Sequence, residues 1–277
     1  MIKPSELSKI SNKEGVRPQQ IEKDYIISWI LWGISSDEFL KKALIFKGGT
    51  CLKKIYFEDY RYSEDMDFTI HPDTEATILD HEIYLAFNRI FREIKEAANI
   101  DISIPESSKD IHETTGSIKF YIDYVGPLGG NGDHVKIDIT RGEKLEFEIH
   151  QGIVIHQYSD LEEESETFKV QSYKLEEIVI EKMAALMGRT VPRDLYDFEY
   201  LTNNEGIELQ DVYFEYQRKA EHKNQNPSEF IQKVSAKEKT FEMGWDKNLS
   251  HQMKSLPKFK DVWRDINKQF RKLEKIK

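Results

Sequence analysis

The sequence has very little cysteine and no long apolar run. Among its 277 residues Cys51 is the only cysteine, which excludes an internal disulfide and fits a reducing compartment. We expect Cys51 to be a packed small residue rather than a nucleophile. No apolar run approaches the roughly 20 residues that span a bilayer, and residues 1–6 show no apolar signal-peptide core. The sequence therefore predicts a cytoplasmic protein that does not enter the membrane.

Several common catalytic motifs are missing as well. The glycine patterns GxxxxGK[ST] and GxGxxG do not occur, which argues against a Walker-type phosphate loop and a dinucleotide fold. The eight histidines form no HExxH motif and do not cluster with the cysteine, so a zinc site is not expected. No GxSxG elbow is present for an acyl-serine mechanism.

The formal net charge of −10 is unfavourable for a general binder of polyanions, but the charge is unevenly distributed. Residues 251–277 carry nine Lys and Arg against three Asp and Glu. Two interpretations stay open: a solvated amphipathic helix, or a surface for RNA or an acidic partner. The acidic run at residues 160–166 is most simply a solvated loop.

Hydrophobic periodicity indicates an α+β protein with a helical C-terminal part. A loop rich in glycine at residues 126–133 joins two alternating strands. We place the boundary near residue 165, with an α+β domain at 1–165 and a helical domain at 166–277. The expected helices are 19–34, 50–58, 78–98, 175–187 and 193–201, and the expected strands are 43–47, 66–70, 117–125, 135–140 and 145–158, the last with a break at 151–152.

The stretch Phe46-Lys47-Gly48-Gly49-Thr50 reads as a strand, a turn and the start of a helix at Thr50, which exposes backbone N–H groups to an anion. It is followed by Asp65-Met66-Asp67 at the start of the next strand. Carboxylates at positions i and i+2 of a strand point to the same face and can share a divalent cation. A phosphate site beside paired carboxylates predicts phosphoryl transfer of the nucleotidyltransferase type.

Three further acids and a lysine are candidates for the same site. Lys136 and Asp138 share the polar face of the strand 135–140, and Asp138 would complete a carboxylate triad if that strand lies beside 66–70. Asp138 at the edge of the sheet is the simpler alternative. Lys182 lies on a helical stripe among apolar residues, where it either extends to solvent or binds a phosphate. Asp194 suits the first turn of the following helix, whereas Asp197 lies inside it and suits a catalytic or orienting role.

Taken together, these motifs resemble the AbiEii/AbiGii nucleotidyltransferase toxins of bacterial type IV toxin–antitoxin and abortive-infection systems, and the related MenT tRNA nucleotidyltransferases. The matching pieces cover residues from about 20 to 201 in order. They are Glu22-Lys23-Asp24, Phe46-Lys47-Gly48-Gly49-Thr50 with Leu52-Lys53, Arg61-x-Ser63-x-Asp65-x-Asp67-Phe68, Lys136-x-Asp138, Glu181-Lys182-x-x-Ala185, and Arg193-Asp194-x-Tyr196-Asp197 with Leu201.

The resemblance implies a polymerase-β-like nucleotidyltransferase domain with a mixed sheet, followed by a helical domain that contributes Lys182 and Asp197. It implies Mg²⁺- or Mn²⁺-dependent transfer of a nucleotide from an NTP to an RNA such as the tRNA 3′ end, which halts translation and growth in antiviral defence. A separately encoded antitoxin is the implied protein partner. The implied roles are Asp65, Asp67, Lys182 and Asp197 in catalysis, Asp65, Asp67 and Asp138 on the metal, and Lys47, Gly48, Gly49, Thr50, Ser63 and Arg193 in nucleotide binding.

Other functions of the same fold are compatible with the sequence. The acceptor could be a small molecule or a protein hydroxyl, and a non-catalytic module that binds a partner is a third alternative. The sequence leaves open which NTP and acceptor are used, the oligomeric state, and the mode of neutralisation by the antitoxin. It also leaves open whether Asp194 or Asp197 is the catalytic acid and whether Asp138 binds metal.

Overall fold

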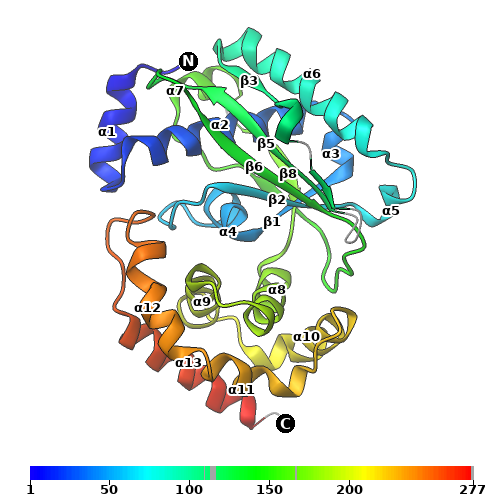
Figure 1. The fold of residues 1–277 in the computed structure, drawn as a ribbon, viewed down its shortest axis with the longest axis vertical. Helices are drawn as coiled ribbons and strands as arrows, with labels where there is room; N and C mark the ends of the chain where they lie inside the picture. Colours follow the sequence, from blue (N-terminus) through cyan, green and yellow to red (C-terminus); the bar gives the residue numbers. More distant parts are fainter. Residues whose placement is uncertain (109, 113–116, 166, 276–277) are drawn as a thin grey trace. The chain divides into compact units, whose positions relative to one another are not determined.

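The structure is a computed structural model that describes residues 1–108, 110–112, 117–165 and 167–275. Contacts divide the chain into two compact units (Figure 1). Unit 1 comprises residues 1–143 and 149–172, and unit 2 comprises residues 144–148 and 173–277. Unit 1 contains a mixed sheet with helices and unit 2 is helical, so the expected α+β class is confirmed.

Unit 1 is built on a sheet of eight strands in the order β3-β5-β6-β2-β1-β8-β7, with β4 paired to β5. The β2–β6 and β1–β8 pairs are parallel and the others are antiparallel, which makes the sheet mixed as expected. The strands are β1 (Leu44–Lys47), β2 (Asp65–Ile70), β3 (Asp101–Ser103), β4 (Asp110–His112), β5 (Ser117–Val125), β6 (Asp133–Thr140), β7 (His150–Ile153) and β8 (Lys169–Ser172).

The helices α2 (Pro18–Ser36) and α6 (Asp80–Ala98) pack against each other along the sheet (Figure 1). The ring centroid of Phe120 on β5 lies 5.2 Å from the ring centroids of both Tyr84 and Phe87 on α6. These contacts place α6 over one face of the sheet. The remaining helices of this unit are α1 (Pro4–Glu14), α3 (Leu40–Ala43), α4 (Gly48–Cys51), the π-helix η1 (Leu52–Tyr56), α5 (Pro72–Glu75), the 3₁₀ helix η2 (Glu106–Ser108) and α7 (Ser159–Glu164).

Strands β5 and β6 have one apolar and one polar face. On β6, Val135, Ile137 and Ile139 are fully buried, whereas the residues between them are half-buried or exposed. Because side chains alternate along a strand, the buried residues form the core beneath α2 and α6 and the others form a polar face on the opposite side. The predicted hairpin between these strands is confirmed, since β5 and β6 pair antiparallel.

Three expected elements differ from the structure. The helix expected at 50–58 begins earlier, at Gly48, and its second half is the π-helix η1. Of the strand expected at 145–158 only β7, residues 150–153, is formed, and it includes the residues 151–152 where a break was expected. The acidic run expected as a loop includes the short helix α7, in which Leu161 is buried.

Unit 2 is helical and its core is rich in aromatic rings. Trp245 packs against Phe259, and Phe230 packs against Phe270, with ring centroids 5.5 and 5.8 Å apart. Its helices are α8 (Leu175–Gly188), α9 (Pro192–Glu199), the π-helix η3 (Tyr200–Asn204), α10 (Leu209–His222), the 3₁₀ helix η4 (Pro227–Glu229), α11 (Phe230–Ser235), α12 (Glu238–Leu249) and α13 (Phe259–Glu274).

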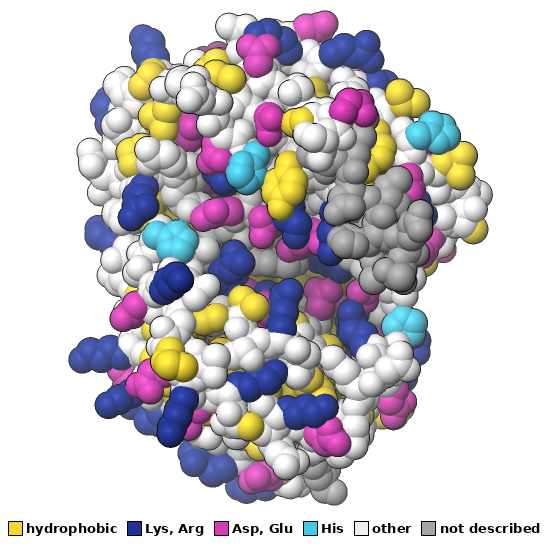
Figure 2. Space-filling view, viewed as in Figure 1, with side chains coloured by type: hydrophobic (Ala, Val, Ile, Leu, Met, Phe, Trp, Pro, Cys, Tyr) yellow, Lys and Arg dark blue, Asp and Glu magenta, His cyan; other side chains and the backbone are white. Residues whose placement is uncertain are grey.

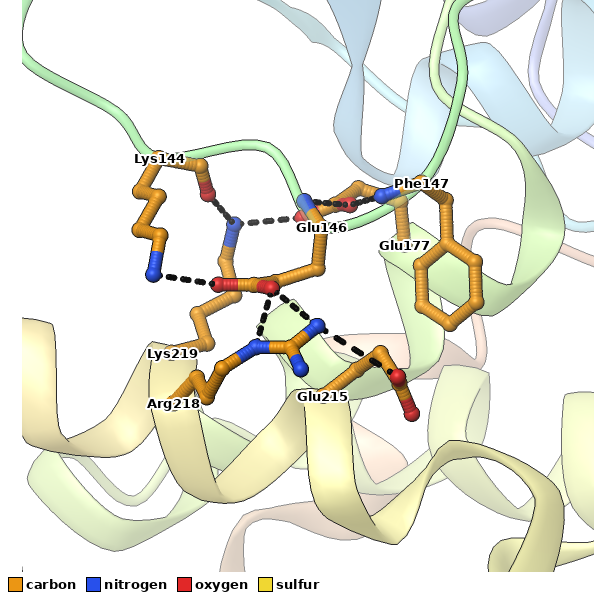
Figure 3. A network of polar contacts seen from close by, with 7 residues as sticks. All are labelled: Lys144, Glu146, Phe147, Glu177, Glu215, Arg218 and Lys219. Carbon is orange, nitrogen blue, oxygen red and sulfur yellow. Dashed lines mark hydrogen bonds and ion pairs between the residues drawn. The ribbon is translucent and has the colours of Figure 1, made fainter.

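A polar network explains why residues 144–148 belong to unit 2 (Figure 3). One carboxylate oxygen of Glu177 on α8 accepts hydrogen bonds from the backbone N–H groups of Glu146 and Phe147, at 2.8 and 2.9 Å. Its other oxygen lies 2.6 Å from the Nζ of Lys219 on α10, which also donates to the carbonyl of Lys144. Since Lys219 and Glu177 are almost fully buried, breaking this pair would leave a charge in the core.

The basic C-terminal region forms the amphipathic helix α13. Its apolar side is buried, and Figure 2 shows Lys and Arg side chains gathered along the lower edge, where Figure 1 draws α12 and α13. Some of this charge is neutralised locally, because Lys268 lies 2.6 Å from Asp265 and Lys272 lies 2.9 Å from Glu208. Within the described residues, none of the helices combines the length and the apolar character needed to span a lipid bilayer.

Candidate active site

The two acids of β2 lie on the polar face of the sheet. Asp65 and Asp67 are half-buried, whereas the alternate residues Met66 and Phe68 are buried on the opposite face. The sequence pattern Asp-x-Asp therefore has the local geometry predicted for it, because strand residues two apart point to the same side.

The predicted third acid is next to this pair. Strand β6 lies parallel to β2, with Asp138 in register with Asp67. The Oδ2 atom of Asp138 lies 3.4 Å from the Nζ atoms of both Lys119 and Lys136. Lys47 of β1 is in register with Asp67 on the other side. Two adjacent carboxylates are thus flanked by lysines, which reduces the repulsion between the acids.

The carboxylates provide the hard oxygen donors that Mg²⁺ prefers. In the part of the chain that the structure describes, no three His, Cys, Asp or Glu side chains are already arranged to hold a metal ion. The register nevertheless brings Asp67 and Asp138 side by side and Asp65 onto the same face. Carboxylates on one face of the sheet are a donor set that fits a divalent cation, while the role of Asp65, Asp67 and Asp138 as ligands stays a prediction.

The glycine turn packs directly against the second acid. Gly48 has a φ of +80°, and a Cβ atom built there would lie 2.6 Å from Oδ2 of Asp67. The position therefore requires glycine for two reasons, the left-handed backbone and the close approach of the carboxylate. The hydroxyl of Thr50 donates to the backbone carbonyl of Asp65, which fixes the turn to the start of β2.

The other nucleotide-binding candidates of unit 1 are buried around the turn. Gly49 lies in α4, Lys47 ends β1, and Ser63 lies two residues before β2. The Nζ of Lys47 lies 3.9 Å from a carboxylate oxygen of Glu143. Lys47, Gly48, Gly49 and Thr50 are thus contiguous with the acids, while the role of each in binding a nucleotide stays a prediction.

The charged residues Glu22, Lys23 and Asp24 of α2 contact the segments that carry the site. Asp24 lies 2.6 Å from the Nζ of the buried Lys54, which follows the glycine turn in η1. Lys23 lies 3.1 Å from Asp133 and 3.8 Å from Glu64, the residue before Asp65. Lys23 and Asp24 are therefore buried and form ion pairs with other segments of the chain, so they are not solvated charges on the surface of α2.

Glu22 anchors the loop between β5 and β6. Its Oε1 accepts a hydrogen bond from the backbone N–H of Leu128 at 2.6 Å, and Gly126 lies so close that a Cβ there would meet the same oxygen at 2.6 Å. Burial raises the pKa of Glu22, the Leu128 N–H opposes this rise, and the nearby Asp133 adds to it. The sequence signal for this role is a run of charges within an otherwise apolar helix.

In unit 2, Lys182 lies between two acids of α9. Its Nζ is 2.8 Å from Asp194 and 2.7 Å from Asp197, and all three side chains are buried. Arg189 makes a second ion pair with Asp194 at 2.7 Å. Burial opposes ionisation of Asp194, but Lys182 and Arg189 hold its pKa below the ordinary value.

This geometry shows the local environment of each candidate in the second unit. Asp194 is a first-turn acid of α9, whose N-cap is Val191, and Arg193 beside it is half-buried. Lys182 is an inward-facing charge rather than one extended to solvent. The predicted orienting contact between Asp197 and Lys182 is present, whereas the catalytic and nucleotide-binding roles of Lys182, Asp197 and Arg193 stay predictions.

Solved structures with the same fold support the architecture. The nucleotidyltransferase toxin MenT4 from Mycobacterium tuberculosis superposes with a TM-score of 0.70 at 14% sequence identity, over 99% of this chain and 90% of that one. JHP933 from Helicobacter pylori superposes with a TM-score of 0.58 at 17% identity, over 94% of this chain and 95% of that one. Among curated proteins, no sequence matches significantly.

The sequence also matches a family model over residues 29–270, which is most of the chain. The model describes the nucleotidyl transferase AbiEii toxin of type IV toxin–antitoxin systems. The matched region includes the glycine turn, the acids of β2 and β6, and the Lys182 cluster. This protein belongs to the AbiEii nucleotidyltransferase toxin family.

Proposed function

We propose that this nucleotidyltransferase toxin transfers a nucleotide from an NTP to an RNA acceptor, the 3′ end of tRNA, in a reaction that requires Mg²⁺ or Mn²⁺. Blocking the acceptor end of tRNA would stop translation and growth, as expected of a toxin. The observation that carries this proposal is the packing of the Gly48 turn against Asp67, on a strand that also carries Asp65.

The residues of the site divide into two groups. The backbone N–H groups of Gly48 and Gly49, with Ser63, bind the triphosphate, because a turn at the start of a helix favours anions. Asp65 and Asp67 hold the metal, with Asp138 as a third ligand. Bound Mg²⁺ supplies positive charge that polarises a phosphoryl oxygen and stabilises the charge of the leaving group.

The reaction forms one bond and breaks one bond at the α-phosphorus of the NTP. The acceptor hydroxyl oxygen bonds to this phosphorus, and the bond from the phosphorus to the oxygen that bridges to the β-phosphate breaks. Pyrophosphate leaves, and the hydroxyl proton passes to solvent. The site residues contribute mainly by positioning the reactants and stabilising charge, as in other phosphoryl transfers.

The test is incubation of the purified protein with bulk tRNA, Mg²⁺ and each α-³²P-labelled NTP in turn, followed by gel electrophoresis of the RNA. We expect label on tRNA from one NTP, and loss of that label in Asp65→Asn and Asp67→Asn. Asp73→Asn, at an exposed acid of α5, is the matched control and should label tRNA as the wild type does.

Two further experiments separate the alternatives. In the first, the labelled NTP is offered with a cell extract. If label appears on a small molecule or on protein and none on RNA, that compound and not RNA is the acceptor. Failure of the wild-type protein to bind any Mg–NTP in calorimetry would favour a non-catalytic module that binds a partner.

We further propose that a separately encoded antitoxin neutralises the protein. The family to which the chain belongs is defined by two-component toxin–antitoxin systems, so a second protein is the natural regulator. Growth arrest on expression of this chain alone, lost in Asp65→Asn, would support a toxin that needs such a partner. An unaffected growth rate with active enzyme would contradict it.

A further inference from the structure

One row of side chains crosses three strands on the polar face of the sheet. Asp65 on β2 is in register with Lys136 on β6, and Lys136 is in register with Tyr121 on β5. Directly paired residues have their side chains on the same face, so Tyr121 shares a face with the site carboxylates. Since neighbouring strands are about 4.8 Å apart, the Cα atom of Tyr121 lies on the order of 10 Å from that of Asp65.

Tyr121 presents an aromatic ring at this surface. Its neighbours Phe120 and Ile122 are buried in the core, whereas Tyr121 is 43% exposed. The ring of His134 on β6 meets it edge to face, with centroids 5.2 Å apart and planes at 78°. This contact orients the tyrosine ring on the polar face of β5. Aromatic rings in such positions stack with unpaired nucleic-acid bases.

Positive charge lies beside the ring. Lys119 precedes Tyr121 by two residues on the same face of β5, and Lys136 is its partner across the strands. Both ammonium groups lie within 3.4 Å of Asp138 and are about one-third exposed. A single-stranded nucleic acid offers a phosphate next to every base, so a ring with two adjacent ammonium groups matches one nucleotide unit.

We propose that Tyr121 is the stacking platform for the unpaired terminal base of the RNA acceptor, with Lys119 and Lys136 binding the adjacent phosphate. This inference rests on the proposed transfer to RNA and identifies residues that receive the acceptor end. It also specifies that the acceptor is a single-stranded end rather than a blunt duplex or a small hydroxyl compound.

The strand order distinguishes the acceptor from the incoming nucleotide. The order β5-β6-β2-β1 places Asp65 and Asp67 between Tyr121 and the glycine turn that follows β1. An in-line displacement requires the attacking hydroxyl and the departing pyrophosphate on opposite sides of the α-phosphorus. With the triphosphate at Gly48 and Gly49, the acceptor hydroxyl approaches from the β5 side, where Tyr121 lies.

The experiment measures steady-state transfer to a short single-stranded RNA. Tyr121→Ala is expected to raise the KM for RNA roughly 5- to 150-fold, the range for loss of one base–aromatic stack, without changing the KM for the NTP. Tyr121→Phe keeps the ring and should recover most of that loss. Val125→Ala, an exposed residue on the same face of β5, is the matched control and should behave as the wild type.

An acceptor with an abasic 3′-terminal residue tests the stacking itself. Without the terminal base, the wild type and Tyr121→Ala should have the same KM for RNA. Binding of fluorescent single-stranded RNA, followed by anisotropy without NTP, should show the same contrast independently of catalysis. Equal RNA affinity of the wild type and Tyr121→Ala, or an equal loss with normal and abasic RNA, would overturn the inference.

Failure of the proposed function would look different. In that case the wild-type protein would place no label on RNA with any NTP, whatever residue occupies position 121. Anisotropy would then decide the stacking inference by itself, because it needs neither an NTP nor turnover.

Discussion

The Nζ atom of Lys54 lies 2.6 Å from Oδ2 of Asp24, in a pair of which each member is only 2% exposed. The hydroxyl of Tyr158 donates to the same oxygen at 2.7 Å. Burial lowers the pKa of Lys54 and Asp24 counteracts this effect. The contact joins α2 to η1, the helical turn that follows the glycine turn of the site.

Lys54→Met should lower the free energy of unfolding by about 3–5 kcal/mol, because it leaves a buried carboxylate without its ammonium partner. The double variant Lys54→Met/Asp24→Asn should recover a large part of this loss, since no uncompensated charge then stays in the core. Urea denaturation measures both effects. The exposed pair Glu38–Lys42 is the control, with an expected loss of about 0.3–0.5 kcal/mol for Lys42→Met. Additive losses in the double variant would contradict this account.

Gly48→Ala should abolish nucleotidyl transfer, because the new Cβ would displace the carboxylate of Asp67. Gly206→Ala is the matched control: Gly206 also has a positive φ, of +72°, but a Cβ there meets nothing within 4 Å. Both variants should lose about 1 kcal/mol of stability from the left-handed backbone, and only Gly48→Ala should lose activity. Retention of full transfer by a folded Gly48→Ala protein would show that the packing against Asp67 is not needed.

Asp138→Asn should raise the Mg²⁺ concentration that gives half-maximal transfer, roughly 10- to 100-fold. The expected cause is loss of one carboxylate from the metal site, because Asp138 is in register with Asp67. The measurement is a Mg²⁺ titration of the labelling reaction at saturating NTP. Asp73→Asn removes an exposed carboxylate of α5 and none from the metal site, so it should leave the Mg²⁺ requirement near that of the wild type. An unchanged requirement in Asp138→Asn would leave this acid as a partner of the lysines only.

Glu199 on α9 should make unit 2 less stable as the pH rises. Burial, reinforced by the nearby Asp265 and opposed by a hydrogen bond with Asn203, raises the pKa of Glu199 from 4.5 to about 7. Between these values the unfolded chain releases the proton while the folded protein keeps it. The folded state therefore binds more protons, and stability falls as the pH rises through this window.

Glu199→Gln removes this titration. At about pH 8 the variant should be more stable than the wild type by about 2 kcal/mol, and the difference should shrink toward about pH 4.5. Thermal or urea unfolding at a series of pH values measures it. Glu205→Gln, an exposed residue a few positions later, should show no such pH dependence. A constant difference across the pH range would contradict the raised pKa of Glu199.

Lys182→Met should lower the free energy of unfolding by about 3–5 kcal/mol, because Asp194 and Asp197 would be left buried without the shared ammonium. Combining it with Asp197→Asn should restore part of the stability. Transfer measured at a temperature where the variants stay folded tests the predicted role in phosphate binding. A folded Lys182→Met enzyme with unchanged KM for the NTP would restrict Lys182 to a structural role.

Local patterns were enough to predict the parts of the fold that follow from local chemistry. Strands β5 and β6 alternate apolar and polar residues, because one face is buried and the other is polar. This alternation predicts both strands and the hairpin that joins them. The acids of β2 share a face for the same reason. The contact between Lys182 on α8 and Asp197 on α9 was one of the two roles that the sequence suggested for Asp197.

Long-range partners were not predictable in this way. Strand β8, only Lys169–Ser172, is too short to show a period, and it is defined by its pairing with β7 and β1. The start of the expected strand 145–158 is not in β7 because Glu177 and Lys219 bind residues 144–147 in the helical unit. Glu22 is separated by 106 positions from Leu128, its hydrogen-bond partner. Tyr121 reaches the row of Asp65 only through the register of three strands.

The route of the chain limits how the protein can be divided. The chain passes between the units after residues 143, 148 and 172, so three covalent connections join them. A protease cut in one connection would leave two intact and release neither unit. A truncated protein that ends at residue 165 would lack β8, the parallel neighbour of β1, and would expose that strand's edge. A fragment that starts at residue 173 would lack residues 144–148 and leave buried Glu177 without two backbone donors. Separate expression of either unit therefore requires joining two pieces of sequence, and not a single cut.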